Sequence, residues 1–215
     1  MFVVIIACFL GCMMQLMGCS IEASRHGGVA MMDSINYKNM EENKYHYKYP
    51  HPSVTTDCVI FGFDGNTVKV LLIERGFDPY KGYWAFPGGF LEMQESAEEG
   101  ARRELMEETG LDTTYVKQFH TFSTPDRDPR ERVISIAYYS LVRMSEVKGM
   151  DDAAQAKWFL LNEVPKLAFD HEEMWRIAQE EILKEMRLNT KDWKEMTKGF
   201  TEEEVEKIKE WIEKR

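Results

Sequence analysis

The segment that ends at Leu111 constrains the fold of this 215-residue chain more than any other part of it. From Gly88 it reads GGFLEMQESAEEGARRELMEETGL. The two glycines allow a tight loop. Ser96 and Glu99 have the spacing of a helix capping box, and Gly110 is placed to end the helix. The segment therefore predicts a loop, a helix and a second loop, with both helix ends fixed by local residues.

Strand patterns surround this helix. Two apolar, β-branched runs joined by the turn Asp64-Gly65-Asn66 indicate a hairpin over residues 54–75. Pro87 and the glycines after it are expected to end a short strand and lead into the loop. The further segments with strand character are 83–86, 114–122, 132–142 and 157–161, with a polar loop at 123–131. This order predicts an α/β fold in which a mixed β-sheet lies between helices.

The last part of the chain has helical character. Apolar residues recur at helical spacing over 169–186, and Thr201 with Glu204 forms a second capping box ahead of an amphipathic helix. The charged run EEEVEKIKEWIEKR is interpreted as the solvated face of that helix. The expected regions are a leader and polar lead-in at 1–50, a globular domain at 51–168 and a helical C-terminal extension at 169–215.

Charge and cysteine content exclude several classes of protein. The net charge is −10, and no Lys/Arg cluster is long enough to follow a phosphate backbone, so nucleic acid is not expected as a partner. Three cysteines, at 8, 12 and 19, fall in the first twenty residues and Cys58 stands alone. This spacing indicates neither a disulfide framework nor a zinc site.

The N-terminal segment leaves two interpretations open. The first nineteen residues are uncharged and apolar, and residues 16–19 resemble a lipoprotein cleavage box that ends at Cys19. A secretory signal normally starts with basic residues, whereas none occurs here before Arg25. The favoured interpretation is a cytoplasmic protein whose translation begins at Met31, Met32 or Met40. The alternative is a lipoprotein that is anchored to a membrane through Cys19.

Three carboxylates share one face of the predicted helix, because Glu104, Glu107 and Glu108 stand at i, i+3 and i+4. Such closely spaced like charges repel one another unless cations lie among them, and oxygen ligands on a rigid helix suit Mg²⁺ or Mn²⁺. Ala97 and Gly100 extend this face, and their small side chains are expected to leave room for a phosphate chain.

From Gly89 the segment has the spacing G-x5-E-x7-R-E-U-x-E-E-x-G-U, with U an aliphatic residue. It resembles the signature of the Nudix hydrolase family at every fixed position. The resemblance implies the Nudix fold, an α/β/α sandwich, and hydrolysis of a nucleoside diphosphate linked to another group. The metal ligands that it implies are the carbonyl of Gly89 and the carboxylates of Glu104, Glu107 and Glu108. The catalytic residues that it implies are Glu107, Glu108, Arg103 and Glu95, of which Arg103 and Glu95 support the loop–helix–loop.

A loop rich in arginine bears on the substrate. The run TPDRDPRER at 124–132, followed by VISIAYY, is similar to the PDRDPRGRV-type loop of ADP-ribose pyrophosphatases, with Glu131 where that pattern has Gly. Its arginines can grip a phosphate or a ribose through forked hydrogen bonds, or they can pair with the aspartates of the loop. The expected substrate-binding residues are Arg127, Asp128, Arg130 and Arg132, together with Arg75 at the end of the second strand.

A second segment, DDAAQAKW at 151–158, is similar to the DDAAEAxW segment of the same subgroup, with Gln155 in place of Glu. If that carboxylate acts as a ligand or base, Asp151 or Asp152 has to replace it. Otherwise both aspartates are solvated turn residues.

Three functions remain open. The first is divalent-metal-dependent hydrolysis of a nucleoside-diphosphate-linked small molecule, ADP-ribose to AMP and ribose 5-phosphate. The second is a ligand-sensing transcription regulator, because residues 50–175 are also similar to Nudix-derived regulators. The third is a non-catalytic module that binds ADP-ribose or another NAD metabolite. The intact carboxylates, and the short acidic run after Thr201, favour the enzyme over a regulator with a recognition helix and wing. The resembled subgroup also suggests a homodimer.

Overall fold

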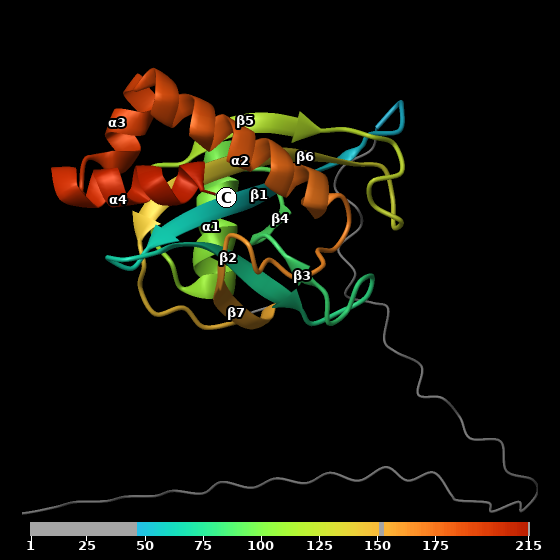
Figure 1. The fold of residues 1–215 in the computed structure, drawn as a ribbon. Helices are drawn as coiled ribbons and strands as arrows, with labels where there is room; N and C mark the ends of the chain where they lie inside the picture. Colours follow the sequence, from blue (N-terminus) through green and yellow to red (C-terminus); the bar gives the residue numbers. More distant parts are fainter. Residues whose placement is uncertain (1–46, 151–152, 215) are drawn as a thin grey trace, which may run out of the picture. The chain divides into compact units, whose positions relative to one another are not determined.

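The computed structural model describes residues 47–150 and 153–214. The anchoring Cys19, the start sites at Met31, Met32 and Met40, and the aspartates Asp151 and Asp152 lie outside these residues. The described residues form seven strands and four helices within one compact unit (Figure 1). The strands are β1 (Ser53–Phe63), β2 (Val68–Arg75), β3 (Trp84–Ala85), β4 (Gly88–Phe90), β5 (Lys117–Phe122), β6 (Val133–Arg143) and β7 (Ala153–Leu160). The helices are α1 (Ala97–Thr109), α2 (His171–Leu188), α3 (Lys191–Thr197) and α4 (Glu202–Glu213).

All seven strands belong to one mixed sheet, so the predicted α/β class is confirmed. The main path through the sheet is β3-β2-β1-β6-β5, with β4 added on β1 and β7 on β2. β1 runs parallel to β6 over its whole length, whereas its pairings with β2 and β4 are antiparallel.

The sheet forks beside β1. On the side away from β6, the first half of β1 pairs with β4 over Thr55–Asp57, and the second half pairs with β2 over Phe61–Phe63. β3 stays paired to β2 through Trp84 and Ala85, so the chain crosses from one arm of the fork to the other at Phe86 and Pro87. The candidate site lies around this fork.

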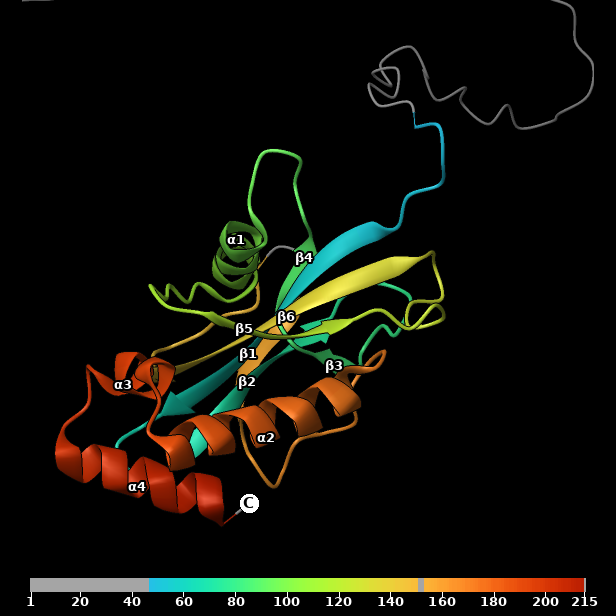
Figure 2. The ribbon, with the colours of Figure 1, turned by 90° about the horizontal axis from the view of Figure 1, so that it is seen from above.

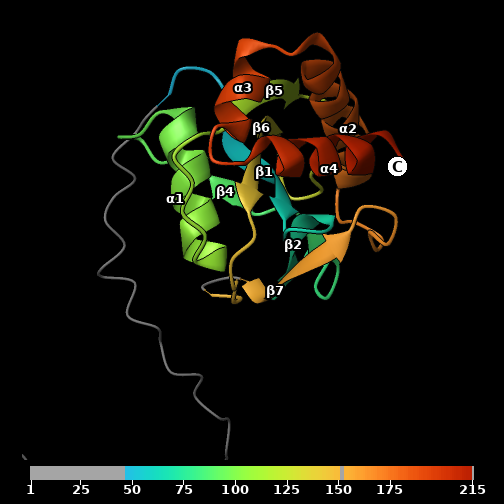
Figure 3. The same cartoon turned by 60° about the vertical axis from the view of Figure 1, so that its left-hand side comes forward.

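Helices cover both faces of the sheet, with α1 on one face and α2, α3 and α4 on the other (Figures 2 and 3). The alternation of side chains along β1 explains both contacts. Ile60 packs with Ala101 and Leu105 of α1, while Val59 and Phe61 face the C-terminal helices. The predicted α/β/α sandwich is therefore confirmed. No helix in the described ranges is long and apolar enough to cross a membrane.

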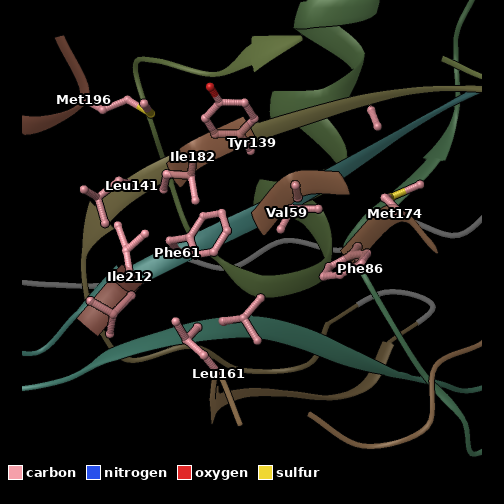
Figure 4. Packing of buried hydrophobic residues seen from close by; sticks show 14 of the residues in the cluster. Val59, Phe61, Phe86, Tyr139, Leu141, Leu161, Met174, Ile182, Met196 and Ile212 are labelled. Carbon is pink, nitrogen blue, oxygen red and sulfur yellow. The ribbon is translucent and has the colours of Figure 1, made fainter. Parts of the chain in front are cut away.

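The larger core lies between the sheet and the C-terminal helices. Figure 4 shows Phe61 close to Ile182 of α2 and to Leu141 of β6, with Ile212 of α4 on the same side. Trp193 of α3 is also buried in this core. The helices after residue 168 therefore share the core of the sheet.

Four elements differ from the sequence predictions. Residues 88–90 form strand β4 where the sequence predicts a loop, because glycines carry no strand pattern and only their pairing with β1 defines the strand. α3 was not predicted, although Thr190 caps it and accepts a hydrogen bond from the N–H of Trp193. β5 begins at Lys117 rather than at residue 114, and β7 begins at Ala153 rather than at residue 157.

Candidate active site

Local residues place helix α1 next to β4. The hydroxyl of Ser96 accepts a hydrogen bond from the N–H of Glu99, and the Glu99 carboxylate accepts one from the N–H of Ser96, so the predicted capping box is present. Gly110 ends the helix in the left-handed conformation, with φ of 71°. Ala101 and Leu105 are fully buried against the sheet. These contacts determine which side chains of α1 face the residues at 88–92.

Arg103 is the centre of the acidic side of the site. Its guanidinium donates to both carboxylate oxygens of Glu95 at 3.0 and 2.7 Å, to Glu104 at 2.8 Å and to Glu107 at 2.9 Å. A fifth bond, of 3.1 Å, goes to the carbonyl of Phe90. The hydrogen bonds from Arg103 lower the pKa of Glu95. Arg103 thus ties the helix to the loop that precedes it, as expected of a supporting residue.

Two glutamates of α1 lie against the glycines of β4. A side chain on Gly89 would collide with the carboxylate of Glu104. Burial raises the pKa of Glu104, and the hydrogen bond from Arg103 only partly offsets this effect. Glu108 is 5% exposed and accepts a hydrogen bond of 2.8 Å from the N–H of Gly88. A side chain on Gly88 would instead collide with the backbone of Thr56 and Asp57 in β1. Gly89 thus allows the close approach of β4 to α1, and Gly88 its close approach to β1.

The small residues on α1 serve a different purpose from the one predicted. A side chain on Gly100 would lie 2.7 Å from Leu91 and 2.8 Å from Glu95. Ala97 packs at the edge of the core beneath α1. The absence of a side chain at Gly100 lets the loop at 91–95 lie on the helix, so the space predicted there for a phosphate chain is filled by Leu91 and Glu95.

A cavity separates α1 from the loop, and the residues around it fit a divalent cation. It is lined by residues 88–92, Arg103, Glu104, Glu107 and Glu108. Among the described residues, no three His, Cys, Asp or Glu side chains converge as a ready metal site. Arg103 accounts for this, since it already bonds the carboxylates of Glu95, Glu104 and Glu107. One guanidinium offsets the charge of only one carboxylate, and the donors are all oxygens, as hard cations such as Mg²⁺ and Mn²⁺ prefer.

A second cavity, of about 230 Å³, lies in the fork of the sheet, on the side of α2. We call it the fork pocket. Its lining residues come from the four strands around the fork, the loop after β2, the end of α1, the arginine loop and the start of α2. They are Thr55, Asp57, Ile73, Arg75, Gly76, Phe77, Asp78, Ala85, Phe86, Gly88, Gly89, Phe90, Glu108, Arg127, Asp128, Arg130, Phe169 and His171. It shares Gly88, Gly89, Phe90 and Glu108 with the first cavity, between α1 and the loop at 88–92, which we call the acidic cavity. The two cavities thus meet at β4.

Two of the predicted substrate-binding arginines lie close to one aromatic ring at the fork pocket. The guanidinium of Arg75 lies 4.8 Å from the ring centre of Phe169, and that of Arg130 lies 5.7 Å from it. Burial lowers the pKa of Arg75, and the neighbouring charge of Arg130 adds to this effect. Arg130 is held by a forked pair with Asp128, 2.7 Å at its shortest. A pocket with two cationic walls suits an anionic or electron-rich ligand.

The other two arginines of the loop donate their hydrogen bonds to groups of the protein itself. Arg127 is 8% exposed and makes a forked pair with Asp170, with bonds of 2.8 and 2.6 Å. Arg132 donates to the carbonyls of residues 123, 124 and 133, and it is not among the residues that line the fork pocket. The structure therefore brings Arg75, Asp128 and Arg130 together, uses Arg127 as a buried support, and leaves Arg132 outside.

Three polar residues of the fork pocket were not predicted from the sequence. Thr55 and Asp57 project from the same face of β1, and His171 begins α2; all three are less than 9% exposed. A signal did exist, because Asp57 directly precedes the apolar half of its strand and a buried charge in that position requires a partner. His171 gave no such signal, since a polar residue at a helix start is ordinary.

Gln155 lies outside both cavities. It is exposed on β7 and pairs in register with Glu74 of β2.

The sequence of this chain is similar to those of known proteins. A model of the NUDIX domain matches residues 51–184. The chain is 45% identical over 137 residues to an ADP-ribose pyrophosphatase of Methanocaldococcus jannaschii, an alignment that covers 64% of this chain and 78% of that protein. It is 32% identical over 169 residues to the ADPR responsive transcriptional repressor NtrR of Acinetobacter baylyi, which covers 76% of this chain and 68% of that protein.

A solved structure agrees with these similarities. The NUDIX domain of Shewanella oneidensis NrtR, crystallised with ADP ribose, superposes with a TM-score of 0.60 at 30% identity, covering 65% of this chain and 94% of that one. Enzymes and regulators thus both occur among the similar proteins.

Proposed function

This chain belongs to the Nudix family, and from that premise we propose that it hydrolyses ADP-ribose to AMP and ribose 5-phosphate. The coarser activity, that of a Nudix hydrolase, follows from the family and from the 45% identical pyrophosphatase. The identity of the substrate has to be argued from the geometry of the site.

The meeting of the two cavities at β4 is the observation that carries the proposal. The acidic cavity holds carboxylates, the fork pocket holds arginines and aromatic rings, and both include Gly88, Gly89 and Glu108. A substrate with an anionic centre and two different ends fits this arrangement, with its diphosphate at β4. The fork pocket, at about 230 Å³, is smaller than the roughly 300–1,000 Å³ of pockets that enclose a whole drug-sized ligand. It therefore suits one end of the substrate.

The proposed metal is Mg²⁺ or Mn²⁺. Glu104, Glu107, Glu108 and the carbonyl of Gly89 would hold it, since these groups line the acidic cavity and supply only oxygen donors. When bound, the cation would neutralise the diphosphate and lower the pKa of a water. Arg103 and Glu95 would keep the carboxylates and the loop in place through the bonds described above.

The protein's own groups would orient the substrate around β4. Arg75 and Arg130 would bind it in the fork pocket, with Asp128 fixing the guanidinium of Arg130. Arg127 would act indirectly, by holding the loop to Asp170. A nucleobase enclosed between the aromatic rings and the strands of the fork pocket would help to keep bulk water away from the reacting phosphorus.

The proposal is tested by incubating the purified protein with ADP-ribose and either cation, and by measuring AMP and ribose 5-phosphate by chromatography. NADH, nucleoside triphosphates and nucleotide sugars serve as competing substrates, and removal of the cation with a chelator should stop turnover. The Glu108→Gln variant is the inactive control, because its amide still accepts the hydrogen bond from the N–H of Gly88. Glu98→Gln, on the exposed part of the same helix, should retain activity. Absence of turnover for every substrate with both cations would refute the proposal.

A regulator is the second candidate, because 32% identity to a repressor extends over 76% of this chain. The C-terminal helices count against it: α3 and α4 bury Trp193, Ile208 and Ile212 in the core, and the first turn of α4 carries three glutamates. Such a surface repels phosphates. Binding to promoter DNA in a gel-shift assay at physiological salt, together with a lack of turnover, would favour the regulator.

Assembly and location complete the proposal. We expect a cytoplasmic homodimer with a nucleoside-diphosphate-linked small molecule as its ligand. Sedimentation analysis of the purified protein tests the dimer. Mass spectrometry of the native N-terminus tests the location, because a lipid-modified Cys19 would show membrane anchoring.

A further inference from the structure

The fork pocket contains a buried hydrogen-bond acceptor and a buried donor that do not satisfy one another. Oδ1 of Asp57 and Nε2 of His171 are 3.6 Å apart, which is too long for a hydrogen bond. Both residues are buried, at 6% and 3% exposure, and both line the pocket. Buried polar groups normally find partners, so this pair has capacity for a ligand.

The hydrogen-bonding roles of the pair are fixed from behind. The N–H of Phe86 donates to Nδ1 of His171 at 3.1 Å, so the proton of the imidazole lies on Nε2. Burial lowers the pKa of His171, although the charge of Asp57 acts in the opposite direction, and the ring is therefore neutral near pH 7. On Asp57, Oδ2 accepts a short hydrogen bond from the hydroxyl of Ser135. What remains for a ligand is the acceptor Oδ1 beside the donor Nε2–H.

A third polar group points to the same conclusion independently. The Oγ1 atom of Thr55 is buried without a hydrogen-bond partner among the described residues, and Thr55 lines the pocket two residues before Asp57 on the same strand face. A buried hydroxyl without a partner lowers stability, so a ligand atom that reached the Thr55 hydroxyl would stabilise the bound state.

The walls of the pocket indicate a flat ligand. Phe77 and Phe90 line it while remaining 63% and 42% exposed, and the ring of Phe169 lies within 6 Å of the guanidinium groups of Arg75 (4.8 Å) and Arg130 (5.7 Å). Exposed aromatic faces in a pocket favour stacking with a nucleobase, since every base has a π face.

We propose that Asp57 and His171 select adenine by reading its 6-amino group and the ring nitrogen beside it. Asp57 accepts from the amino group and His171 donates to the ring nitrogen, which is the donor and acceptor pattern that distinguishes adenine from 6-oxopurines. A 6-oxopurine such as hypoxanthine would place its oxygen against the carboxylate of Asp57. This inference rests on the proposed function, because it places the adenosine half of the substrate in the fork pocket.

The test compares the binding of AMP and IMP to the full-length protein by calorimetry in the presence of Mg²⁺. The two nucleotides share ribose and phosphate and differ at the base edge. The wild-type protein should bind AMP at least about tenfold more tightly than IMP, since a site built to form hydrogen bonds discriminates strongly against a ligand that cannot form them. Equal affinities would overturn the inference.

A substitution sharpens the comparison. Asp57→Asn keeps the shape of the side chain and supplies an N–H that can donate to the oxygen of hypoxanthine. The ratio of AMP affinity to IMP affinity should fall by at least about tenfold in this variant. A thermal melt establishes that the variant is folded. An unchanged ratio in a folded variant would overturn the inference.

Two adjacent threonines provide a matched pair that does not disturb the carboxylate. Thr55→Val removes the unpartnered hydroxyl in the fork pocket, whereas Thr56→Val removes an unpartnered hydroxyl on the opposite face of β1. AMP binding should weaken several-fold in the first variant and not in the second. An equal loss of AMP affinity in the two variants would overturn the inference that this side of β1 contacts the base.

These measurements separate the inference from the proposed function. Preference for AMP without turnover of ADP-ribose would leave the base recognition standing and refute the hydrolysis. Turnover of ADP-ribose together with equal binding of AMP and IMP would support the hydrolysis and refute the base recognition.

Discussion

Arg103 holds Glu95 through two parallel hydrogen bonds, Nε to Oε2 at 3.0 Å and Nη2 to Oε1 at 2.7 Å. Glu95 lies just before the first turn of α1 and also accepts a bond from the N–H of Glu92, so the pair closes the loop onto the helix. The same guanidinium reaches Glu104 and Glu107. One side chain therefore sets both the shape of the loop and the orientation of two proposed metal ligands.

Replacement of Arg103 by Lys should lower kcat about 10- to 100-fold, the usual effect of losing a group that orients metal ligands. Lysine keeps the charge but cannot form the forked pair with Glu95. The control is Arg102→Lys, because Arg102 is exposed further and approaches Glu98 only to 3.9 Å. Steady-state kinetics with ADP-ribose check the prediction. Equal kcat values for the two variants would contradict the role assigned to Arg103.

Gly89→Ala should reduce activity and raise the Mg²⁺ concentration needed for half-maximal rate. The new Cβ would push against the carboxylate of Glu104, which must then move away from β4. The melting temperature should change little, because the displaced group is the end of a flexible side chain. Gly199→Ala is the matched control, since no atom lies within 4 Å of its Cβ position. A Mg²⁺ titration of the rate that is unaltered in Gly89→Ala would count against Glu104 as a ligand.

Arg130→Gln should raise the KM for ADP-ribose about tenfold with a smaller effect on kcat, because it removes a cation from the wall of the fork pocket. Arg132→Gln serves as the comparison, since its donors go to backbone carbonyls outside that pocket. Its KM should stay within about twofold of the wild-type value. If Arg132→Gln had the larger effect, the structural separation of the two arginines would not describe substrate binding.

The stability of the protein should fall as the pH drops below about 6.5, the ordinary pKa of histidine, in part because of His171. Burial lowers the pKa of His171 in the folded protein, so the unfolded chain binds its proton first. The stabilising contribution is therefore complete above the unfolded pKa and is lost as the pH falls toward the folded one. Denaturant melts between pH 7.5 and pH 5 should show a shallower pH dependence for His171→Gln than for the wild type. His120→Gln, at an exposed position on β5, should retain the wild-type slope.

The sequence could predict the elements whose signals are local. The capping residues Ser96 and Glu99, the terminating Gly110 and the apolar stripe of α1 define this helix whatever surrounds it. The hairpin of β1 and β2 follows in the same way from two β-branched runs and a turn. In contrast, β4 consists of two glycines and a phenylalanine and exists only because β1 pairs with it.

The site divides along the same line. The sequence by itself determined the family and the carboxylates of α1, because their spacing along one helix fixes their relative positions. Only the tertiary structure decided which arginines line the fork pocket, and that Asp57 of β1 and His171 of α2 lie 3.6 Å apart in the same pocket. Residues on separate elements are brought together by strand register and helix packing, which no local pattern encodes. The pairing of Asp57 with His171 is for this reason visible only in the folded chain.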